Sequence, residues 1–381
     1  MKERNKTTKS DHIGIYIHIP FCNKKCNYCD FVSFKSDVLT QKKYVAAIKK
    51  EIGQRAAECK NPSQKQNKSV DTIFFGGGTP SCLYNGGLFD IFDSIRNHFD
   101  LNTLTEFTVE ANPETVTQSF IDECLKMGVN RLSFGLQTTS DRLLKDFRTH
   151  SFQDFLNAVN LARNAKIFNI NADLILGLKN QSIAEIKNSV STLVNLKIPH
   201  ISAYGLKVED GTTLSKSGFA PDDDLITDAF FEIKSVLKND YTHYEISNFS
   251  HPNHECRHNQ KYWQMQDYIG FGISASSFIF KSRKTNISSL QDYLNCKFYY
   301  ETEDGEVNFL TEYIMLSLRT NQGLSISFLK SKSIDILSNK AVCLLLKDGI
   351  LINLGDHLMI NSDHFYISNS IIIKILESIG L

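Results

Sequence analysis

The chain has 381 residues, more than one minimal core needs and fewer than three ordinary domains would use, so one large domain with a smaller appendage is expected. Hydrophobic residues make up 41% and charged residues 22%, as in ordinary globular proteins, which excludes a fibrous or wholly disordered chain. The 42 Lys and Arg balance the 42 Asp and Glu, so no excess positive charge is available to hold nucleic-acid phosphates or an acidic membrane surface.

The N-terminal segment shows no targeting signal. Residues 1–11 are polar and mostly basic, and we expect a disordered tail over residues 1–12. The apolar stretch from Ile13 to Phe21 is too short for a secretory signal core, and no run approaches the roughly 20 apolar residues that cross a bilayer. The nine cysteines are an odd number, which does not fit a complete set of intramolecular disulfides. These features predict a cytoplasmic protein.

Strand-like and helix-like segments alternate through the first half of the chain. Short β-branched or aromatic runs predict strands at 14–19, 72–75, 106–110, 131–136, 171–176 and 201–206. Longer amphipathic stretches predict helices at 44–59, 88–98, 118–127, 152–165 and 183–196. Residues 60–69 are polar and are expected to form a solvated loop. The alternation predicts an α/β protein with a parallel sheet, either an open barrel or a doubly wound sheet.

The alternation ends after about Pro221. The pattern then predicts a helix at 222–240, a strand at 244–248, an irregular segment at 249–263, helices at 311–318 and 334–346, a hairpin within 351–367 and a last helix at 371–379. We therefore expect a barrel core over 13–240, an extension over 241–308 and a smaller, mostly helical domain over 309–381. Helices followed by a two-stranded wing suggest a winged-helix shape. Six basic residues face six acidic ones in that domain, which favours a packing or lid role over DNA binding.

Three cysteines lie close together after the first predicted strand. Cys22, Cys26 and Cys29 have the spacing C-x3-C-x2-C. Three thiolates on one tight loop can converge on a metal centre, but they are one ligand too few for a closed iron–sulfur cluster, which would leave one iron open to a small molecule. The alternatives are a zinc site completed by a histidine such as His18, and three unrelated buried thiols.

Further motifs follow the next predicted strands. Residues 76–80 read Gly-Gly-Gly-Thr-Pro, which is either a tight turn or a segment whose backbone approaches a ligand closely. Glu110, Gln137 and Asp173 fall near the carboxyl ends of their strands, the edge at which α/β and barrel enzymes bind ligands. Each of these three alone would be ordinary for a helix cap or a solvated turn.

The cysteine loop together with these motifs resembles the radical S-adenosylmethionine (radical SAM) superfamily. Within it, the chain is most similar to the branch of oxygen-independent coproporphyrinogen III oxidase, and closest to the HemW-type haem chaperones. The resemblance runs from about Tyr16 into the C-terminal region. It implies an incomplete parallel (β/α) barrel, a [4Fe-4S] cluster on Cys22, Cys26 and Cys29, and SAM on the open iron. Cleavage of SAM to a 5'-deoxyadenosyl radical would require an electron donor.

The resemblance also implies which residues bind SAM. Gly77, Gly78 and Thr79 match the segment that holds the methionine part of the cofactor. The other matching positions are Tyr16, Tyr28, Glu110, Gln137, Arg148 and Asp173. The chain departs from the family pattern in having Lys179 where a proline is usual, and in a segment before Arg148 that is one residue short. The structure must therefore decide where Arg148 lies.

Two features favour the chaperone-like branch over the oxidase. The oxidase carries a fourth cysteine where this chain has Phe31, and a longer N-terminal extension. The segment 258–263 reads His-Asn-Gln-Lys-Tyr-Trp and matches a motif associated with haem binding in the chaperone-like branch. His258 would then ligate the haem iron while the aromatic residues cover the macrocycle. The alternatives are a core-capping His-Asn pair and a zinc site, the latter formed by His251, His254, Cys256 and His258.

The expected function is therefore that of a haem chaperone, which binds haem and delivers it to acceptor haemoproteins. Any association with a membrane would be peripheral and would occur through those acceptors. The alternative is an enzyme that oxidatively decarboxylates coproporphyrinogen III to protoporphyrinogen IX, and a third possibility is a zinc-binding interaction protein. No nucleic acid is expected among the partners.

Overall fold

The computed structural model of the protein describes residues 12–59, 68–299 and 308–381. The tail expected over residues 1–12 lies outside the described residues except for His12, which begins the first strand. The loop expected over 60–69 also lies outside them except for its last two residues.

An 11-stranded sheet forms the larger part of the molecule, and its central six strands are neighbours in chain order. These strands are β1 (His12–Ile19), β2 (Ser69–Gly77), β3 (Glu106–Ala111), β4 (Arg131–Gln137), β5 (Asn169–Leu176) and β6 (His200–Gly205). Each pairs with the next in parallel. All six strands expected from the sequence are confirmed, with bounds that differ by at most three residues.

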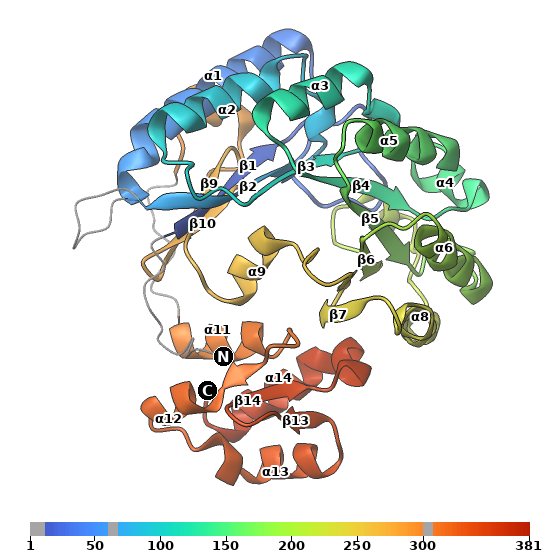
Figure 1. Ribbon diagram of the computed structural model, residues 1–381, viewed down its shortest axis with the longest axis vertical. Helices are drawn as coiled ribbons and strands as arrows, with labels where there is room; N and C mark the ends of the chain where they lie inside the picture. The colour runs from blue at the N-terminus through green and yellow to red at the C-terminus, as the bar shows by residue number, and fades with distance from the viewer. Residues whose placement is uncertain (1–11, 60–67, 300–307) are drawn as a thin grey trace.

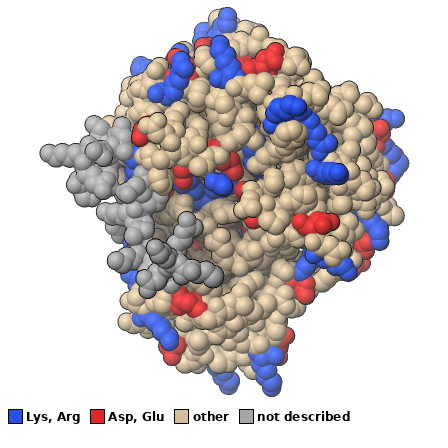
Figure 2. All heavy atoms as spheres, in the orientation of Figure 1, with Lys and Arg blue, Asp and Glu red and all other residues tan. Residues whose placement is uncertain are grey.

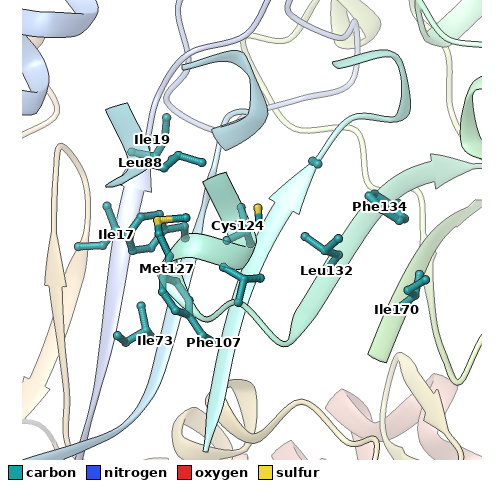
Figure 3. Packing of buried hydrophobic residues seen from close by; sticks show 14 of the residues in the cluster. Ile17, Ile19, Ile73, Leu88, Phe107, Cys124, Met127, Leu132, Phe134 and Ile170 are labelled. Atoms are coloured by element: carbon teal, nitrogen blue, oxygen red, sulfur yellow. The ribbon is translucent and has the colours of Figure 1, made fainter. Parts of the chain in front are cut away.

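Helices cover one face of this sheet. Successive side chains along a strand point to opposite faces, so one set of strand side chains packs against the helices. The main covering helices are α1 (Val38–Arg55), α2 (Gly87–His98), α3 (Gln118–Met127), α5 (Phe152–Asn164), α6 (Ile183–Asn195) and α8 (Asp223–Leu237). Figure 3 shows strand residues such as Ile73, Phe107 and Leu132 beside Cys124 and Met127 of α3, all in one buried cluster. In Figure 1 these helices lie on the outer side of a curved sheet. The sheet is therefore an incomplete barrel and not a doubly wound sheet.

Shorter elements complete this part of the chain. They are η1 (Ala56–Cys59), η2 (Pro80–Cys82), η3 (Pro113–Thr115), α4 (Asp141–Phe147), α7 (Thr213–Lys216) and α10 (Leu290–Leu294). The α4 helix was not expected from the sequence. Arg148 directly follows it and lies near the carboxyl ends of the parallel strands.

The segment after β6 differs from the sequence-based expectation. The single strand expected at 244–248 is wrong, because β7 (Thr242–Glu245) and β8 (Asn248–Ser250) form a hairpin that pairs antiparallel with β6. The irregular segment expected at 249–263 contains α9 (Arg257–Trp263). Three unpredicted strands follow, namely β9 (Tyr268–Phe271), β10 (Ser276–Ile279) and β11 (Ser282–Thr285), and β9 pairs in parallel with β1. The extension therefore adds strands at both edges of the sheet.

The C-terminal region has its own buried core and a three-stranded sheet. Its elements are α11 (Phe309–Ser317), β12 (Leu324–Ser325), α12 (Ile326–Ser331), η4 (Ile336–Ser338), α13 (Lys340–Lys347), β13 (Leu351–Asn353), β14 (His357–Ile360), η5 (Ser362–Ile367) and α14 (Ser368–Ser378). The hairpin is confirmed. The single helix expected at 334–346 is wrong, because Asn339 caps α13 by accepting bonds from the backbone N–H of Ala341 and Val342. Figure 1 shows α9 between this region and the sheet.

The surface charges are mixed. On the face drawn in Figure 2, basic and acidic side chains are interspersed and no continuous basic area is visible, so this face offers no evident track for nucleic-acid phosphates. Within the described ranges, no helix combines the length and apolar character that a bilayer crossing requires.

Candidate functional site

The three cysteines occupy one loop at the carboxyl end of β1, and all three line a single cavity of 460 Å³. Backbone bonds shape this loop, since the Cys22 N–H donates to Phe34 O at 3.0 Å and the Cys29 N–H donates to Cys26 O at 3.2 Å. The thiols are free and partly buried. Burial raises the pKa of Cys22 and of Cys29, so a bound cation is needed to favour their thiolates at neutral pH.

The glycine-rich turn fastens this loop to the end of β2. Gly77 has φ +109°, and a side chain at Gly78 would meet the carbonyl oxygens of Ile19 and Phe21 at 2.9 Å. Instead, the N–H of Gly78 donates to Ile19 O and that of Thr79 to Phe21 O, both at 2.8 Å. The Thr79 hydroxyl lies 3.4 Å from Cys22 Sγ. Glycine is therefore required here because the turn packs closely against the backbone of the cysteine loop. Gly77 and Gly78 also line the cavity, where a ligand can approach their backbone.

Glu110, Gln137 and Asp173 line the same cavity from three neighbouring strands, the first two at the strand ends and Asp173 three residues before the end of β5. Gln137 has φ +73° and follows a register shift in β4, so the strand end bends at this point. Burial raises the pKa of Glu110 to about 8, with repulsion from Asp173 as the second cause, and burial also raises the pKa of Asp173. The Glu110 carboxylate accepts a bond from the Gly77 N–H at 3.1 Å. Such carboxyl groups suit the hydroxyls of a sugar.

Arg148 also lines the cavity, although the sequence left its register open. Its guanidinium donates to Cys26 Sγ at 3.0 Å and to the Tyr28 hydroxyl at 3.2 Å. It also donates to Asn112 Oδ1, and to Gly135 O at 3.3 Å. Arg148 and Tyr28 thus belong to the surroundings of the cysteine loop.

Tyr16 and His258 lie behind the cavity wall. The Tyr16 hydroxyl shares a hydrogen bond with His18 Nδ1 at 3.1 Å, and its ring packs on Phe74, which lines the cavity. His258 is 0% exposed. Its Nδ1 lies 2.9 Å from the Thr72 hydroxyl, and its Nε2 lies 2.9 Å from the Tyr262 hydroxyl.

His258 is therefore held as a neutral imidazole. Burial, followed by the nearby Lys261 charge, lowers the pKa of His258 to about 3. Both ring nitrogens are engaged within the protein, so iron ligation would require this side chain to leave at least one of its partners.

The zinc alternatives find no support in the described residues. Among them, no three His, Cys, Asp or Glu side chains converge closely enough to hold one metal ion. A zinc ion requires its ligand atoms around a single centre, whereas a cubane cluster binds each cysteine through a different iron and so needs thiols that are further apart. Cys22, Cys26 and Cys29 line one cavity without forming such a single-ion group.

Several polar residues that line the deeper part of the cavity were missed by the sequence analysis. They are Arg131, Ser133, Asn171, His200, Ser202 and Asn248. The missed signal was the strict two-residue alternation of polar side chains within strands, as in Arg131-x-Ser133 and Asn171-x-Asp173.

Comparisons with known proteins identify the family. Residues 16–193 match the radical SAM superfamily. The haem chaperone HemW of Lactococcus lactis is 33% identical, over 83% of this chain and 84% of that protein. The Escherichia coli HemW is 36% identical over 69% of each chain, and the Bacillus subtilis HemW is 33% identical over 81% of this chain and 84% of that protein. This chain belongs to the HemW family of radical SAM proteins.

Structural comparison extends the likeness of fold to the C-terminal region. The solved structure of Escherichia coli coproporphyrinogen III oxidase, a radical SAM enzyme, superposes with a TM-score of 0.81 at 20% identity. The match covers 97% of this chain and 91% of that one. At this identity the likeness concerns the fold. The expected radical SAM barrel with a mostly helical C-terminal domain is thus confirmed.

The cofactors of a radical SAM protein are a [4Fe-4S] cluster and SAM, and the residues present fit both. Three thiols share one loop, which is one ligand fewer than a closed cluster needs, and the carboxyl groups of Glu110 and Asp173 line the same cavity, where they suit the hydroxyls of a sugar. When bound, these groups supply one-electron chemistry. The protein's own contribution is to hold them in a partly enclosed space beside a fixed guanidinium, that of Arg148.

Proposed function

We propose that this HemW family member binds haem and delivers it to acceptor haemoproteins. The observation that carries the proposal is the match to proteins named haem chaperone HemW, at 33% identity over 83% of this chain. A local feature supports it. The oxidase branch carries a fourth cysteine at the position of Phe31, whereas phenylalanine has no metal-ligating group. Phe31 is 60% exposed and lines the cavity.

The cofactor residues are part of the proposal. Cys22, Cys26 and Cys29 would hold the cluster. SAM would be held by Tyr28, Gly77, Gly78, Thr79, Glu110, Gln137, Arg148 and Asp173, all of which line one cavity. Tyr16 would act from behind Phe74, supporting the wall on which the cofactor rests. If SAM is cleaved, an electron donor is a further partner.

The proposal includes a cytoplasmic location, with any membrane contact made through the haem acceptors. The nine cysteines are all free thiols in the structure, as they would be in a reducing compartment.

The cluster is tested by anaerobic reconstitution. The wild-type protein should take up iron and sulfide and gain the absorbance of an iron–sulfur cluster, and the Cys22→Ala, Cys26→Ala, Cys29→Ala triple variant should not. Cys343→Ala is the matched control, because that thiol is exposed and lies in the C-terminal domain. Equal iron and sulfide in the triple variant would contradict the assignment.

Haem carriage is tested on the reconstituted protein. Haem titrated into the wild type should be bound stably and pass to an apo-haemoprotein, as followed by the Soret band. Incubation with coproporphyrinogen III, SAM and a reductant under anaerobic conditions should give no vinyl product. Decarboxylation without haem transfer would overturn the proposal in favour of the oxidase.

The role of His258 as haem ligand is tested through its partner Thr72. If His258 must leave the Thr72 hydroxyl to bind iron, Thr72→Val removes one hydrogen bond, of about 1 kcal/mol, that opposes ligation. Haem should then bind about fivefold more tightly to Thr72→Val and much more weakly to His258→Ala. Unchanged haem affinity and spectrum in both variants would place the ligand elsewhere.

A further inference from the structure

The inward face of the sheet is polar well below the strand ends. Residues in alternation along β4, β5 and β6 line the cavity and carry hydroxyl, amide, carboxyl, imidazole or guanidinium groups. They include Arg131, Ser133, Asn171, Asp173, His200 and Ser202. Closed barrels of parallel strands are usually filled at this level by branched apolar side chains. The polar lining here therefore calls for a polar occupant.

The strand register places Arg131 one layer deeper than the carboxyl group of Glu110. Ser133 pairs with Glu110, whereas Arg131 pairs with Thr108 on one side and Asn169 on the other. Side chains two residues apart on a strand point to the same face. Arg131 is thus on the same wall as Glu110, but further from the cysteine loop.

The guanidinium of Arg131 lacks a hydrogen-bond or ion-pair partner among the described residues. It is 2% exposed, its Nε is buried without a hydrogen-bond partner, and it makes no hydrogen bond or ion pair with any of them. Other buried polar atoms on the neighbouring strands are also unpartnered: Thr108 Oγ1, Asn169 Oδ1, Asn248 Oδ1 and Ser250 Oγ. A buried cation is normally paired, because leaving it unpaired in a low-dielectric interior is costly.

The charges of Glu106 and Asp173 act on Arg131 and raise its pKa, but neither carboxyl group forms a hydrogen bond or an ion pair with it. Glu106 uses its two oxygens to accept bonds from the N–H groups of Arg257 and His258, at 2.9 and 3.0 Å. Asp173 accepts a bond from the Asn171 amide at 2.8 Å. Burial raises the pKa of Glu110 to about 8, so this group is largely uncharged at neutral pH and opposes an incoming anion only weakly.

We infer that the inner end of the cavity is a binding subsite for a carboxylate group, with Arg131 as its anchor and Asn171, His200, Ser202 and Asn248 as its neutral walls. A planar guanidinium pairs with a carboxylate through two parallel bonds. A phosphate dianion fits less well, because burial keeps His200 neutral and Arg148 is engaged at the cysteine loop. The subsite does not depend on haem transfer. The carboxylate could come from a haem propionate or from a small free acid.

The experiment compares wild-type protein carrying its reconstituted cluster with Arg131→Met, which keeps the side-chain length and removes the charge. The first measurement titrates haem and haem dimethyl ester into both proteins. The second compares the melting temperature of each protein in sodium propionate with its melting temperature in sodium chloride at equal ionic strength. If the haem propionate is the source, Arg131→Met should bind haem about tenfold more weakly than the wild type does. Both proteins should then bind haem dimethyl ester with equal affinity. If a small acid is the source, propionate should raise the melting temperature of the wild type alone.

Two further variants keep the test decisive. Arg142→Met is the matched control, because Arg142 pairs with Glu185 at the surface and should leave both measurements at wild-type values. Arg131→Lys retains the cation, should retain part of the effect, and replaces Arg131→Met if that variant does not fold. The subsite proposal would be wrong if the wild type and Arg131→Met bound haem equally and propionate did not shift the melting temperature of the wild type. Ordered water would then be the occupant of this space. Because haem transfer to an acceptor is not measured here, failure of the subsite is distinguishable from failure of the proposed function.

Discussion

Glu110 combines burial with a like-charged neighbour, and both act in the same direction on its proton. Its pKa rises from the ordinary 4.5 to about 8, first through burial and then through Asp173. The folded protein therefore holds this proton in a pH range where the unfolded chain has released it. Stability from this group is full below 4.5 and is lost as the pH rises towards 8.

We expect Glu110→Gln to remove this part of the pH dependence. Without SAM, the melting temperature of the wild type should fall between pH 6 and 9 more steeply than that of the variant, which should be the more stable protein at the alkaline end. Glu232→Gln is the control, because Glu232 pairs with Lys187 at the surface. Parallel profiles for wild type and Glu110→Gln would contradict the prediction. SAM binding, measured by equilibrium dialysis, should weaken by about tenfold in the variant.

How far the site could be predicted depends on how locally each residue is placed. The cysteine loop and the Gly-Gly-Gly-Thr-Pro turn are contiguous in sequence, so their convergence was predictable. Glu110, Gln137 and Asp173 follow from the rule that parallel strands end at one edge. Arg131 could not be found by that rule, because it is the first residue of its strand and yet lines the cavity.

The α9 helix shows how one element can depend on a side chain far away in sequence. It has seven residues, too few for stability alone, and it begins without a side-chain cap of its own. Glu106 of β3 accepts bonds from the first N–H groups of this helix, those of Arg257 and His258. A buried carboxylate at a helix N-terminus accepts hydrogen bonds from these donors. Its negative charge also interacts favourably with the positive end of the helix dipole.

We expect Glu106→Gln to destabilise the protein by about 1–3 kcal/mol and to loosen α9, because a neutral amide is a weaker acceptor for both N–H groups. Trp263 ends α9 and is the only tryptophan in the chain, so its fluorescence reports on this helix directly. Glu123→Gln is the matched control, since Glu123 caps the N–H of Phe89 at 2.9 Å on another helix. Denaturant unfolding should show a loss in both variants, and only Glu106→Gln should change the tryptophan spectrum under native conditions. An unchanged spectrum in Glu106→Gln would show that α9 is held by other contacts.

The same dependence explains which elements the sequence did not predict. The central strands and covering helices have long, regular apolar patterns, and these were found. The strands β9, β10 and β11 have four residues each, and β9 is fixed by pairing with β1, more than 200 residues earlier. No local pattern specifies such a strand. The hairpin of β7 and β8 was likewise predicted as one strand because its turn is short.

At the scale of the whole molecule, a buried polar network ties the extension to the N-terminal part of the barrel. Glu51 and Arg55 of α1 form an ion pair at 2.5 Å. Arg55 donates to Gly270 O at 2.7 Å, and Glu51 accepts from the Asn286 amide at 2.7 Å and from the Tyr293 hydroxyl at 2.5 Å. Because these groups are buried and mutually satisfied, the extension through residue 293 is bound into the same body as α1.

The C-terminal domain is attached differently. Its core, which includes Leu345, Leu358 and Ile375, is a cluster separate from that of the barrel. Two partly exposed ion pairs, Lys234 with Asp363 and Arg283 with Glu312, contribute about 1 kcal/mol or less to this attachment. A short backbone pairing adds to it, with residues 244–246 of the extension bonded to residues 319–321. Because the two apolar cores are separate clusters, we expect them to unfold in separate steps.

Calorimetry of the wild-type protein should therefore resolve two transitions, which core substitutions assign. Leu345→Ala should destabilise the C-terminal transition by about 2–5 kcal/mol and leave the other in place, since Leu345 is 4% exposed within that core. Leu132→Ala, at a fully buried position of β4, should lower only the barrel transition, and Trp263 fluorescence should change with that transition. A single transition lowered equally by both substitutions would show instead that the C-terminal domain folds as one cooperative unit with the barrel.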